Sequence, residues 1–187
     1  MHRMIPIFLL VVITTVTSCS KASPTTNSMA LGFKSTFTIQ WPGQQEESFQ
    51  IMPGKTGEVK YFNAGFTESK FDKETGTALH DGSATIYDVT VYEYPPKSLD
   101  DEKMTPQDIL NASRVVKQAE ISFKEIQHGP RKYPGHDIYK KNDKSFSRIL
   151  TVMAENRLYF VSVTSKKEEN LKSPQVEAFF ESFTIKE

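Results

Sequence analysis

Two histidines in this chain are each followed directly by an aspartate, and these pairs are the residues best suited to bind a metal ion. The pairs are His80-Asp81 and His136-Asp137. Imidazole nitrogens and carboxylate oxygens are ordinary ligands of zinc and similar metals, and we expect both pairs on loops or at a strand edge. Adjacent residues of a strand point to opposite faces, so His136 and Asp137 are not expected to chelate one ion together. We therefore favour turn and surface roles for both pairs, and we predict neither a metal nor another cofactor.

Cys19 is the only cysteine of the chain, and it follows an apolar segment. Residues 1–3 carry positive charge, residues 4–13 are apolar and small residues come next, which is the order of an export signal. A helix of ten residues is about 15 Å long, roughly half of the hydrocarbon core of a bilayer. The segment is therefore too short for a permanent membrane span. The thiol could be a site of lipid attachment, a spare thiol left by ordinary secretion, or a buried core residue.

The residues that end at this cysteine, Val16-Thr17-Ser18-Cys19, resemble the lipobox of bacterial lipoproteins. In that motif an aliphatic residue and two small residues precede a cysteine that is acylated and becomes the new N-terminus. The resemblance implies palmitate or related acyl chains on Cys19, and each buried methylene of such chains contributes about 0.8 kcal/mol to membrane binding. Ser20, rather than an aspartate, follows the cysteine, which resembles the signal for the periplasmic side of an outer membrane where the organism has one. We predict an exported protein that is anchored to a membrane of the cell envelope.

Cleavage before Cys19 divides the chain into a signal peptide (residues 1–18), a flexible tether rich in serine, threonine and lysine (19–34) and a single domain (35–187). Arg3 is the one charged side chain that the cleavage removes, so 22 basic and 23 acidic side chains remain. A net charge of −1 argues against a nucleic-acid partner, because nucleic-acid-binding domains are normally strongly basic.

The sequence carries no recognisable catalytic motif. It has no Gly-x-Ser-x-Gly elbow, no His-Glu-x-x-His pair and no glycine-rich phosphate loop. Acylation would also remove Cys19 from the possible nucleophiles. We therefore predict that the protein is not an enzyme.

A set of tyrosines could rim a binding surface, because tyrosine offers rigid contact area with a polar tip. The alternative, which we favour, is that these side chains fill the space between a sheet and its helices. The tyrosines are Tyr87, Tyr92, Tyr94, Tyr133 and Tyr139.

The elements that would position these residues are mostly short strands. Segments that alternate in polarity or are rich in β-branched and aromatic residues end at turn residues. The predicted strands are 37–42, 47–53, 58–66, 84–94, 121–127, 136–141, 146–154 and 157–165. Between them, residues 67–82 predict an exposed loop and residues 140–144 a solvated hairpin turn. Glu155-Asn156 predicts another hairpin, with Asn156 in the left-handed conformation.

Two helices are predicted by a capping residue that is followed by proline. Thr105-Pro106 begins the first, with Asp108 as the acid of a capping box, and Ser173-Pro174 begins the second. Each helix has an apolar face suited to packing on a sheet. The faces consist of Ile109, Ala112, Val116 and Ala119 in the first helix and of Val176, Phe179, Phe180 and Phe183 in the second.

This order of elements, together with four short motifs, resembles a family of uncharacterised bacterial secreted proteins and lipoproteins related to the PsbP-like fold. The motifs are Trp41-Pro42-Gly43, a tight turn at Tyr133-Pro134-Gly135, Asn156-Arg157-Leu158-Tyr159 and the FFESF segment 179–183. The resemblance covers residues 33–186 and implies an α+β fold with a central antiparallel sheet and helices on both faces, an α/β/α sandwich. This chain has His136-Asp137 where the relatives carry arginine and an acid.

The resemblance and the missing motifs together predict a function class. Proteins with the PsbP-like fold include an extrinsic photosystem subunit and a Ran-binding import factor, which both act by binding other proteins. We therefore predict a membrane-anchored, non-enzymatic envelope lipoprotein with a protein-binding or complex-assembly role. The alternative is a small-ligand or metal-binding module of the periplasm.

Overall fold

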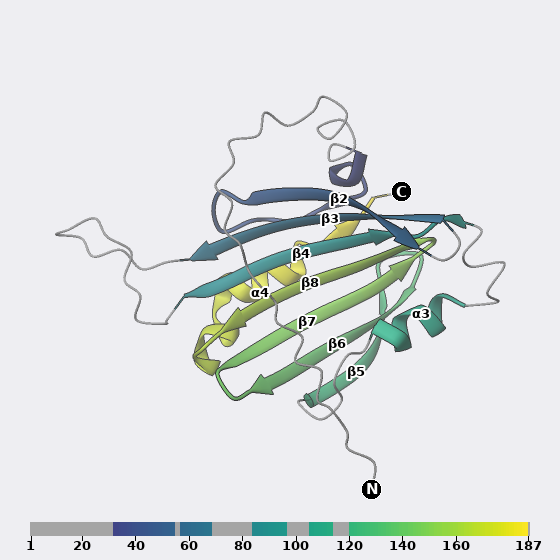
Figure 1. Cartoon of the computed structure of the whole chain (residues 1–187). Coiled ribbons are helices and arrows are strands. Elements are labelled where there is room, and N and C mark those ends of the chain that lie inside the picture. The colour runs from purple at the N-terminus through teal and green to yellow at the C-terminus, as the bar shows by residue number, and fades with distance from the viewer. Residues whose placement is uncertain (1–31, 55–56, 69–83, 97–104, 114–119, 187) are drawn as a thin grey trace, which may run out of the picture.

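The main element of the fold is a seven-stranded antiparallel sheet with the strand order β2-β3-β4-β8-β7-β6-β5 (Figure 1). The computed structural model describes residues 32–54, 57–68, 84–96, 105–113 and 120–186. The strands of the sheet are β2 (Glu46–Gly54), β3 (Gly57–Glu68), β4 (Thr85–Glu93), β5 (Glu120–His128), β6 (Tyr133–Asn142), β7 (Ser145–Ala154) and β8 (Arg157–Ser165). Two further strands, β1 (Phe37–Thr38) and β9 (Thr184–Ile185), pair with each other.

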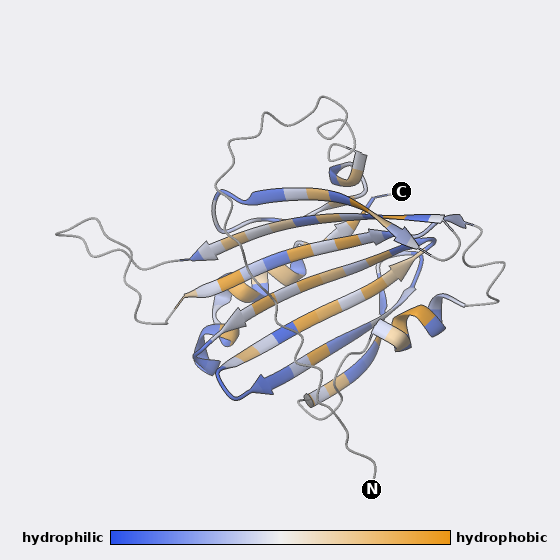
Figure 2. Cartoon of the chain, viewed as in Figure 1, coloured by the Kyte–Doolittle hydropathy of each residue, from blue (hydrophilic) through white to orange (hydrophobic). Residues whose placement is uncertain are grey.

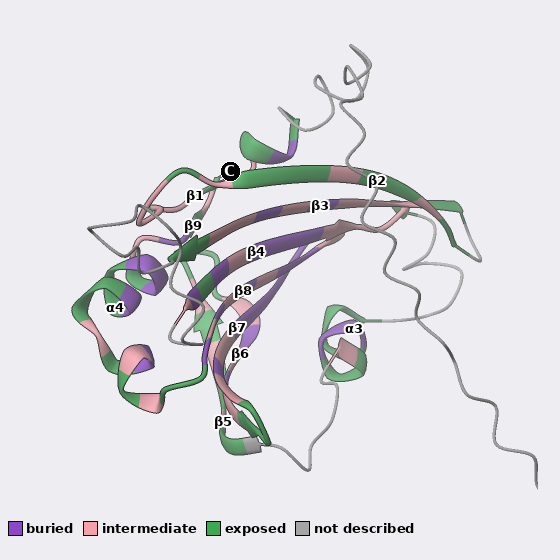
Figure 3. Cartoon of the chain, turned by 60° about the vertical axis from the view of Figure 1, so that its left-hand side comes forward, coloured by how far each residue is buried: buried purple, intermediate pink, exposed green. Residues whose placement is uncertain are grey.

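Two short α-helices lie on opposite faces of this sheet (Figure 3). They are α3 (Pro106–Ser113) and α4 (Pro174–Glu181), and a 3₁₀ helix, η2 (Glu168–Lys172), precedes α4. We call the two sides of the sheet the α3 face and the α4 face. Alternate residues of each strand belong to different faces, as the alternating colours along β4, β8 and β7 illustrate (Figure 2).

The predicted α+β class with an α/β/α sandwich is wrong. The described chain is mostly β-structure, and α4 and the described part of α3 have only eight residues each. A helix of this length spans about 12 Å, whereas the nine- and ten-residue strands of the sheet span about 30 Å. Neither helix can therefore cover its face of the sheet, and no described helix covers the middle of the α3 face.

Most of the strand predictions are confirmed. They rest on residues that alternate in character along the chain, and this alternation arises because the two faces of the sheet have different surroundings. The exception is the first, since only Phe37–Thr38 of residues 37–42 form a strand. The predicted tight turn at residues 133–135 is wrong, because these residues begin β6 and Pro134 pairs with Gln127 of β5. The chain reverses just before them, where Gly129 and Lys132 adopt positive φ angles of 69° and 56°.

The hairpin between β7 and β8 is at the predicted position, but its residues have different roles from those predicted. Glu155, not Asn156, adopts the left-handed conformation, with φ 54°. Asn156 instead binds the chain just after β4. Its side-chain amide donates to the main-chain carbonyl of Tyr94 at 2.7 Å, and its main-chain carbonyl accepts from the main-chain amide of Tyr94 at 2.9 Å. These bonds fix the position of Tyr94 beside the sheet.

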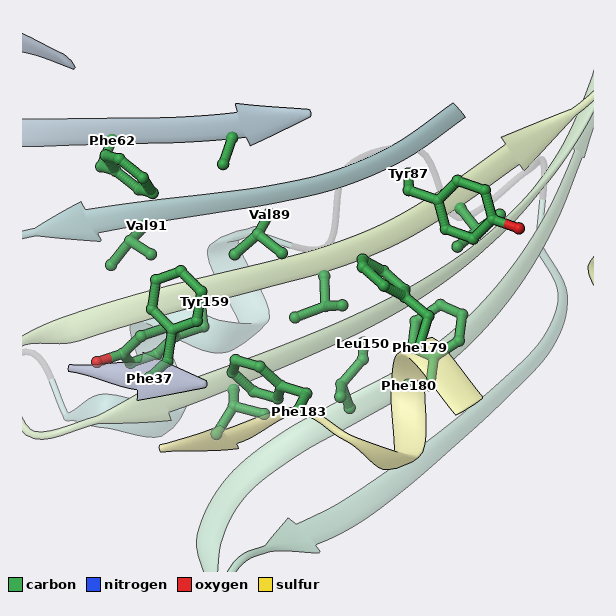
Figure 4. Close-up of a cluster of buried hydrophobic side chains, with 14 of the residues drawn as sticks. Phe37, Phe62, Tyr87, Val89, Val91, Leu150, Tyr159, Phe179, Phe180 and Phe183 are labelled. Carbon is green, nitrogen blue, oxygen red and sulfur yellow. The ribbon is translucent and has the colours of Figure 1, made fainter. Parts of the chain in front are cut away.

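The main hydrophobic core lies between the sheet and α4 (Figure 4). Ser173 caps α4 by accepting a hydrogen bond from the Val176 amide at 3.3 Å, and Val176, Phe179 and Phe180 are buried. Phe33, within the last residues of the predicted tether, also belongs to this core. Its remaining aromatic members include Phe37, Phe62, Tyr87, Tyr159 and Phe183.

An arginine on β7 ties α4 to the sheet. The Arg148 guanidinium lies 4.5 Å from the centre of the Phe180 ring and donates to both oxygens of Glu177 at 2.9 Å. It also donates to Asp137 on β6 at 3.4 Å. Apolar packing and charge pairing therefore both hold α4 against the sheet.

The second, smaller core lies under α3. The predicted capping box is confirmed, since the Thr105 amide donates to Asp108 at 2.8 Å and the Asp108 amide donates to the Thr105 hydroxyl at 3.2 Å. Ile109 is buried as predicted, and Leu110 is buried beside it. Ala112 was predicted to belong to the packed face, but it is exposed. Val116 and Ala119 lie outside the described residues.

Candidate functional site

The structure separates the residues of the second His-Asp pair. His136 is 0% exposed, lies on the inner strand β6 and contacts the Phe123 ring with 4.7 Å between ring centres. Asp137 points to the other face, where it pairs with Arg148. The expectation that this pair lies on a loop or a strand edge is therefore wrong. His80 and Asp81 lie outside the described residues, and within the described ranges no three His, Cys, Asp or Glu side chains gather as metal ligands.

The predicted tyrosine set does not form one surface, because its members lie on both faces of the sheet. Tyr87 is buried on the α4 face, with its ring centre 5.1 Å from that of Phe179. Tyr133 and Tyr139 also pack against the main core. Tyr92 and Tyr94 pack against the small core under α3. Only these two remain as candidates for a binding surface on the α3 face.

A groove of about 460 Å³ lies on the α3 face, between the end of α3 and the part of the sheet that α3 leaves uncovered. Its volume is within the range of small-molecule sites, which is roughly 300–1,000 Å³. It involves β4, β7 and β8 together with Ser113, the last described residue of α3. Its principal lining residues are Asp88, Tyr92, Tyr94, Ser113, Ile149 and Phe160.

Strand alternation and register bring the groove residues together. On β4, Tyr87, Val89 and Val91 are buried in the main core, so Asp88, Thr90 and Tyr92 must point to the opposite face. The neighbouring strand β8 then places Phe160 opposite Thr90. The strand β4 therefore contributes side chains to the main core from one face and to the groove from the other.

Aromatic rings form the apolar wall of the groove. The ring of Tyr92 lies between those of Tyr61 and Phe160, with ring centres 5.3 Å and 5.8 Å away. Burial, and secondarily Tyr61 and Asp88, raises the pKa of Tyr92. Burial and the neighbouring Tyr92 raise the pKa of Tyr94. Both phenols therefore stay protonated at neutral pH and present a neutral hydroxyl beside an apolar ring.

The groove also contains a carboxylate that is held by neutral groups. The Asn63 side-chain amide donates to Oδ2 of Asp88 at 2.6 Å and to the Thr90 hydroxyl at 3.0 Å. The Thr90 hydroxyl donates to Oδ1 of Asp88 at 3.0 Å. These bonds orient the carboxylate, and none of the described lysine or arginine side chains pairs with it.

A glycine on the next strand leaves the carboxylate open on one side. Gly65 of β3 lies directly opposite Asp88 in the strand register. A Cβ atom at residue 65 would lie 3.6 Å from Oδ2 of Asp88, so any longer side chain would extend across the carboxylate. The absence of a side chain at Gly65 therefore keeps Asp88 accessible from the β3 side.

This arrangement is suited to binding a group that is both apolar and cationic. The rings of Tyr92 and Phe160 offer contact area and a negative π face, and Asp88 offers a fixed charge within a partly buried site. Sequence reasoning identified Tyr92 and Tyr94 but not Asp88, Asn63, Gly65 or Phe160. The pattern that could have identified Asp88 is the alternation in residues 84–94. Its even-numbered positions, which face away from the main core, combine polar and aromatic residues.

Neither a scan against models of protein families nor a search of curated proteins finds a match to this chain. Among the helices that the structure describes, none is long and apolar enough to cross a membrane.

Proposed function

We propose that this chain is a non-enzymatic, lipid-anchored protein of the cell envelope that binds another protein through the α3 face of its sheet. The sequence features around Cys19 support the location. The groove that contains Asp88, Tyr92 and Phe160 supports the binding role. This groove is the observation that carries the proposal.

The composition of the α3 face favours a protein partner. Ile86 lies on the same face of β4 as Asp88, two residues away, and is 46% exposed. An exposed isoleucine therefore adjoins a groove with the aromatic rings of Tyr92 and Phe160. Protein-binding surfaces combine aromatic and aliphatic anchors with a few oriented polar groups in this way.

A small ligand is the second candidate occupant, and the volume of the groove is the observation that favours it. At about 460 Å³ the groove has room for a compact organic molecule. Mass spectrometry of the purified protein under native conditions distinguishes the two candidates. A small ligand would add a constant mass of a few hundred daltons, whereas we expect the mass of the lipidated chain alone.

A photocrosslinking residue at Ile86 tests the protein-binding proposal, with Ile51 as the matched control. Both isoleucines lie on strands and are similarly exposed, at 46% and 44%, but Ile51 lies on β2 and belongs to the α4 face. We expect irradiation of cells to produce one discrete adduct with another protein from position 86. From position 51 we expect at most one tenth of that yield.

Two outcomes would contradict this proposal. Adducts of equal yield and identity from both positions would mean that the partner contacts the α3 face no more than the α4 face. Absence of any adduct from position 86, with the probe shown to be incorporated, would mean that no protein occupies this face in the cell.

A further inference from the structure

The groove contains a negative charge without a described counter-charge, and this charge restricts the partner. Each oxygen of Asp88 accepts one hydrogen bond from a neutral group, Oδ2 from Asn63 and Oδ1 from Thr90. A carboxylate has about four acceptor positions, so both oxygens can accept a further donor. The described residues therefore orient Asp88 but leave acceptor positions on both of its oxygens unfilled.

We propose that Asp88 receives the guanidinium group of an arginine side chain that the partner protein inserts into the groove. The inference rests on the proposed protein-binding function. An arginine donates two parallel hydrogen bonds to a carboxylate, which suits a site where both oxygens have free acceptor positions. Its planar group also stacks on aromatic rings, and Tyr92 and Phe160 line the same groove.

The open side at Gly65 gives this guanidinium a route to the carboxylate. Gly65 and Asp88 are opposite each other on adjacent strands, and the position that a Cβ atom would occupy is 3.6 Å from Oδ2. Within 4 Å of that position the described atoms are Oδ2 of Asp88 and the Tyr87 carbonyl oxygen, so a group that enters over Gly65 meets the carboxylate directly. The pKa values of Tyr92 and Tyr94 are raised, so both phenols are neutral at neutral pH and add no second negative charge to the groove.

A purely structural role for Asp88 is the alternative. Asn63, Asp88 and Thr90 would then form only a polar contact between β3 and β4. D88N separates the two roles because asparagine has the same shape as aspartate. Its carbonyl can accept from Asn63 and its amide can donate to Thr90, so the contact remains while the charge is lost.

The test measures the yield of the adduct from a photocrosslinking residue at Ile86 in the full chain in cells. We expect D88N to lower this yield at least tenfold, because a charge-assisted bidentate contact is lost. E125Q is the matched control, since Glu125 is an exposed acid on the same face of edge strand β5 and does not line the groove. We expect E125Q to leave the yield unchanged.

A second variant keeps the charge and blocks access to it. We expect G65V to lower the yield at least tenfold as well, because the valine side chain would extend over the Asp88 carboxylate. Thermal melting followed by circular dichroism should show that both variants fold. If D88N failed to fold, G65V would still decide whether access to Asp88 matters.

A charge exchange gives the most specific readout. Mass spectrometry of the wild-type adduct identifies the arginines of the partner near the crosslinked peptide. We expect replacement of one of them by glutamate to abolish the adduct and D88K to restore at least half of the yield.

The outcomes separate this inference from the proposed function. A partner adduct that is unaffected by D88N and G65V would overturn the arginine contact and leave protein binding intact. An adduct of two copies of this chain, or a crosslink within one copy, would overturn the assignment to a separate partner. Absence of any adduct in the wild type would overturn the proposed function itself.

Discussion

Replacement of Phe179 by alanine is expected to lower the free energy of unfolding by about 3–5 kcal/mol, which is typical of a fully buried phenylalanine. Phe179 is 1% exposed, and its ring contacts those of Trp41, Tyr87 and Phe180 at 5.4, 5.1 and 5.8 Å between ring centres. No neighbouring backbone can collapse easily into the space, because the sheet and α4 are both held by hydrogen bonds. A domain of this size has a total stability of about 5–15 kcal/mol, so the loss is a large fraction.

Urea denaturation followed by far-ultraviolet circular dichroism measures this effect. I51A is the matched control, because Ile51 is 44% exposed on the same α4 face. Its replacement should change the stability by less than about 0.5 kcal/mol. Equal effects of F179A and I51A would contradict the placement of the main core under α4.

Replacement of Cys19 by alanine is expected to release the protein from membranes completely. Two or three acyl chains contribute about 0.8 kcal/mol per buried methylene, and alanine cannot be acylated. We expect the wild-type chain to incorporate radiolabelled palmitate and to sediment with the envelope. C19A should incorporate no label and should appear in the soluble fraction after cell disruption.

S18A controls for changes in the signal itself. Ser18 precedes Cys19, and alanine is a preferred residue of the lipobox at that place, so labelling should persist or increase. Continued labelling of C19A would refute the anchor. Equal loss of labelling in both variants would point to impaired export rather than to loss of the acylated residue.

Strands were predictable from this sequence because their signal is local. In residues 84–94, Tyr87, Val89 and Val91 alternate with Asp88 and Thr90, and this period of two specifies a strand with two different faces. Both helix starts were predictable for the same reason, since a cap and a proline act within one turn. Turn details were less predictable, and tertiary contacts explain why. Asn156 avoids the left-handed conformation and instead binds the backbone of Tyr94, 62 residues away.

The layer arrangement was not predictable, because it depends on how far each helix extends relative to the sheet. The first helix was expected to include Val116 and Ala119, and the structure describes α3 from Pro106 to Ser113, with residues 114–119 outside the described ranges. The described residues of α3 leave much of the α3 face without a helical cover. The groove that contains Asp88 and Phe160 lies at that boundary.

The candidate site was predictable only in part, because it depends on strand order and register. Asn63, Asp88 and Phe160 are widely separated in the sequence and come together because β3, β4 and β8 are neighbours. Gly65 leaves the space beside Oδ2 of Asp88 free of a side chain from β3, and no local pattern marks this glycine. His136 and Asp137 were prominent in the sequence, but the structure assigns them to a buried ring contact and an ion pair.

The central claim is that the α3 face is the surface on which this protein binds its partner. Cys19 is the only cysteine of the chain, so a cysteine introduced by I86C or I51C is the only free thiol of the acylated protein. The most direct measurement compares the rate of maleimide labelling in isolated envelopes with that in the purified protein. We expect I86C to react at least tenfold more slowly in envelopes and I51C to react equally fast in both. Equal rates for I86C in both preparations, or protection of I51C instead, would contradict the claim.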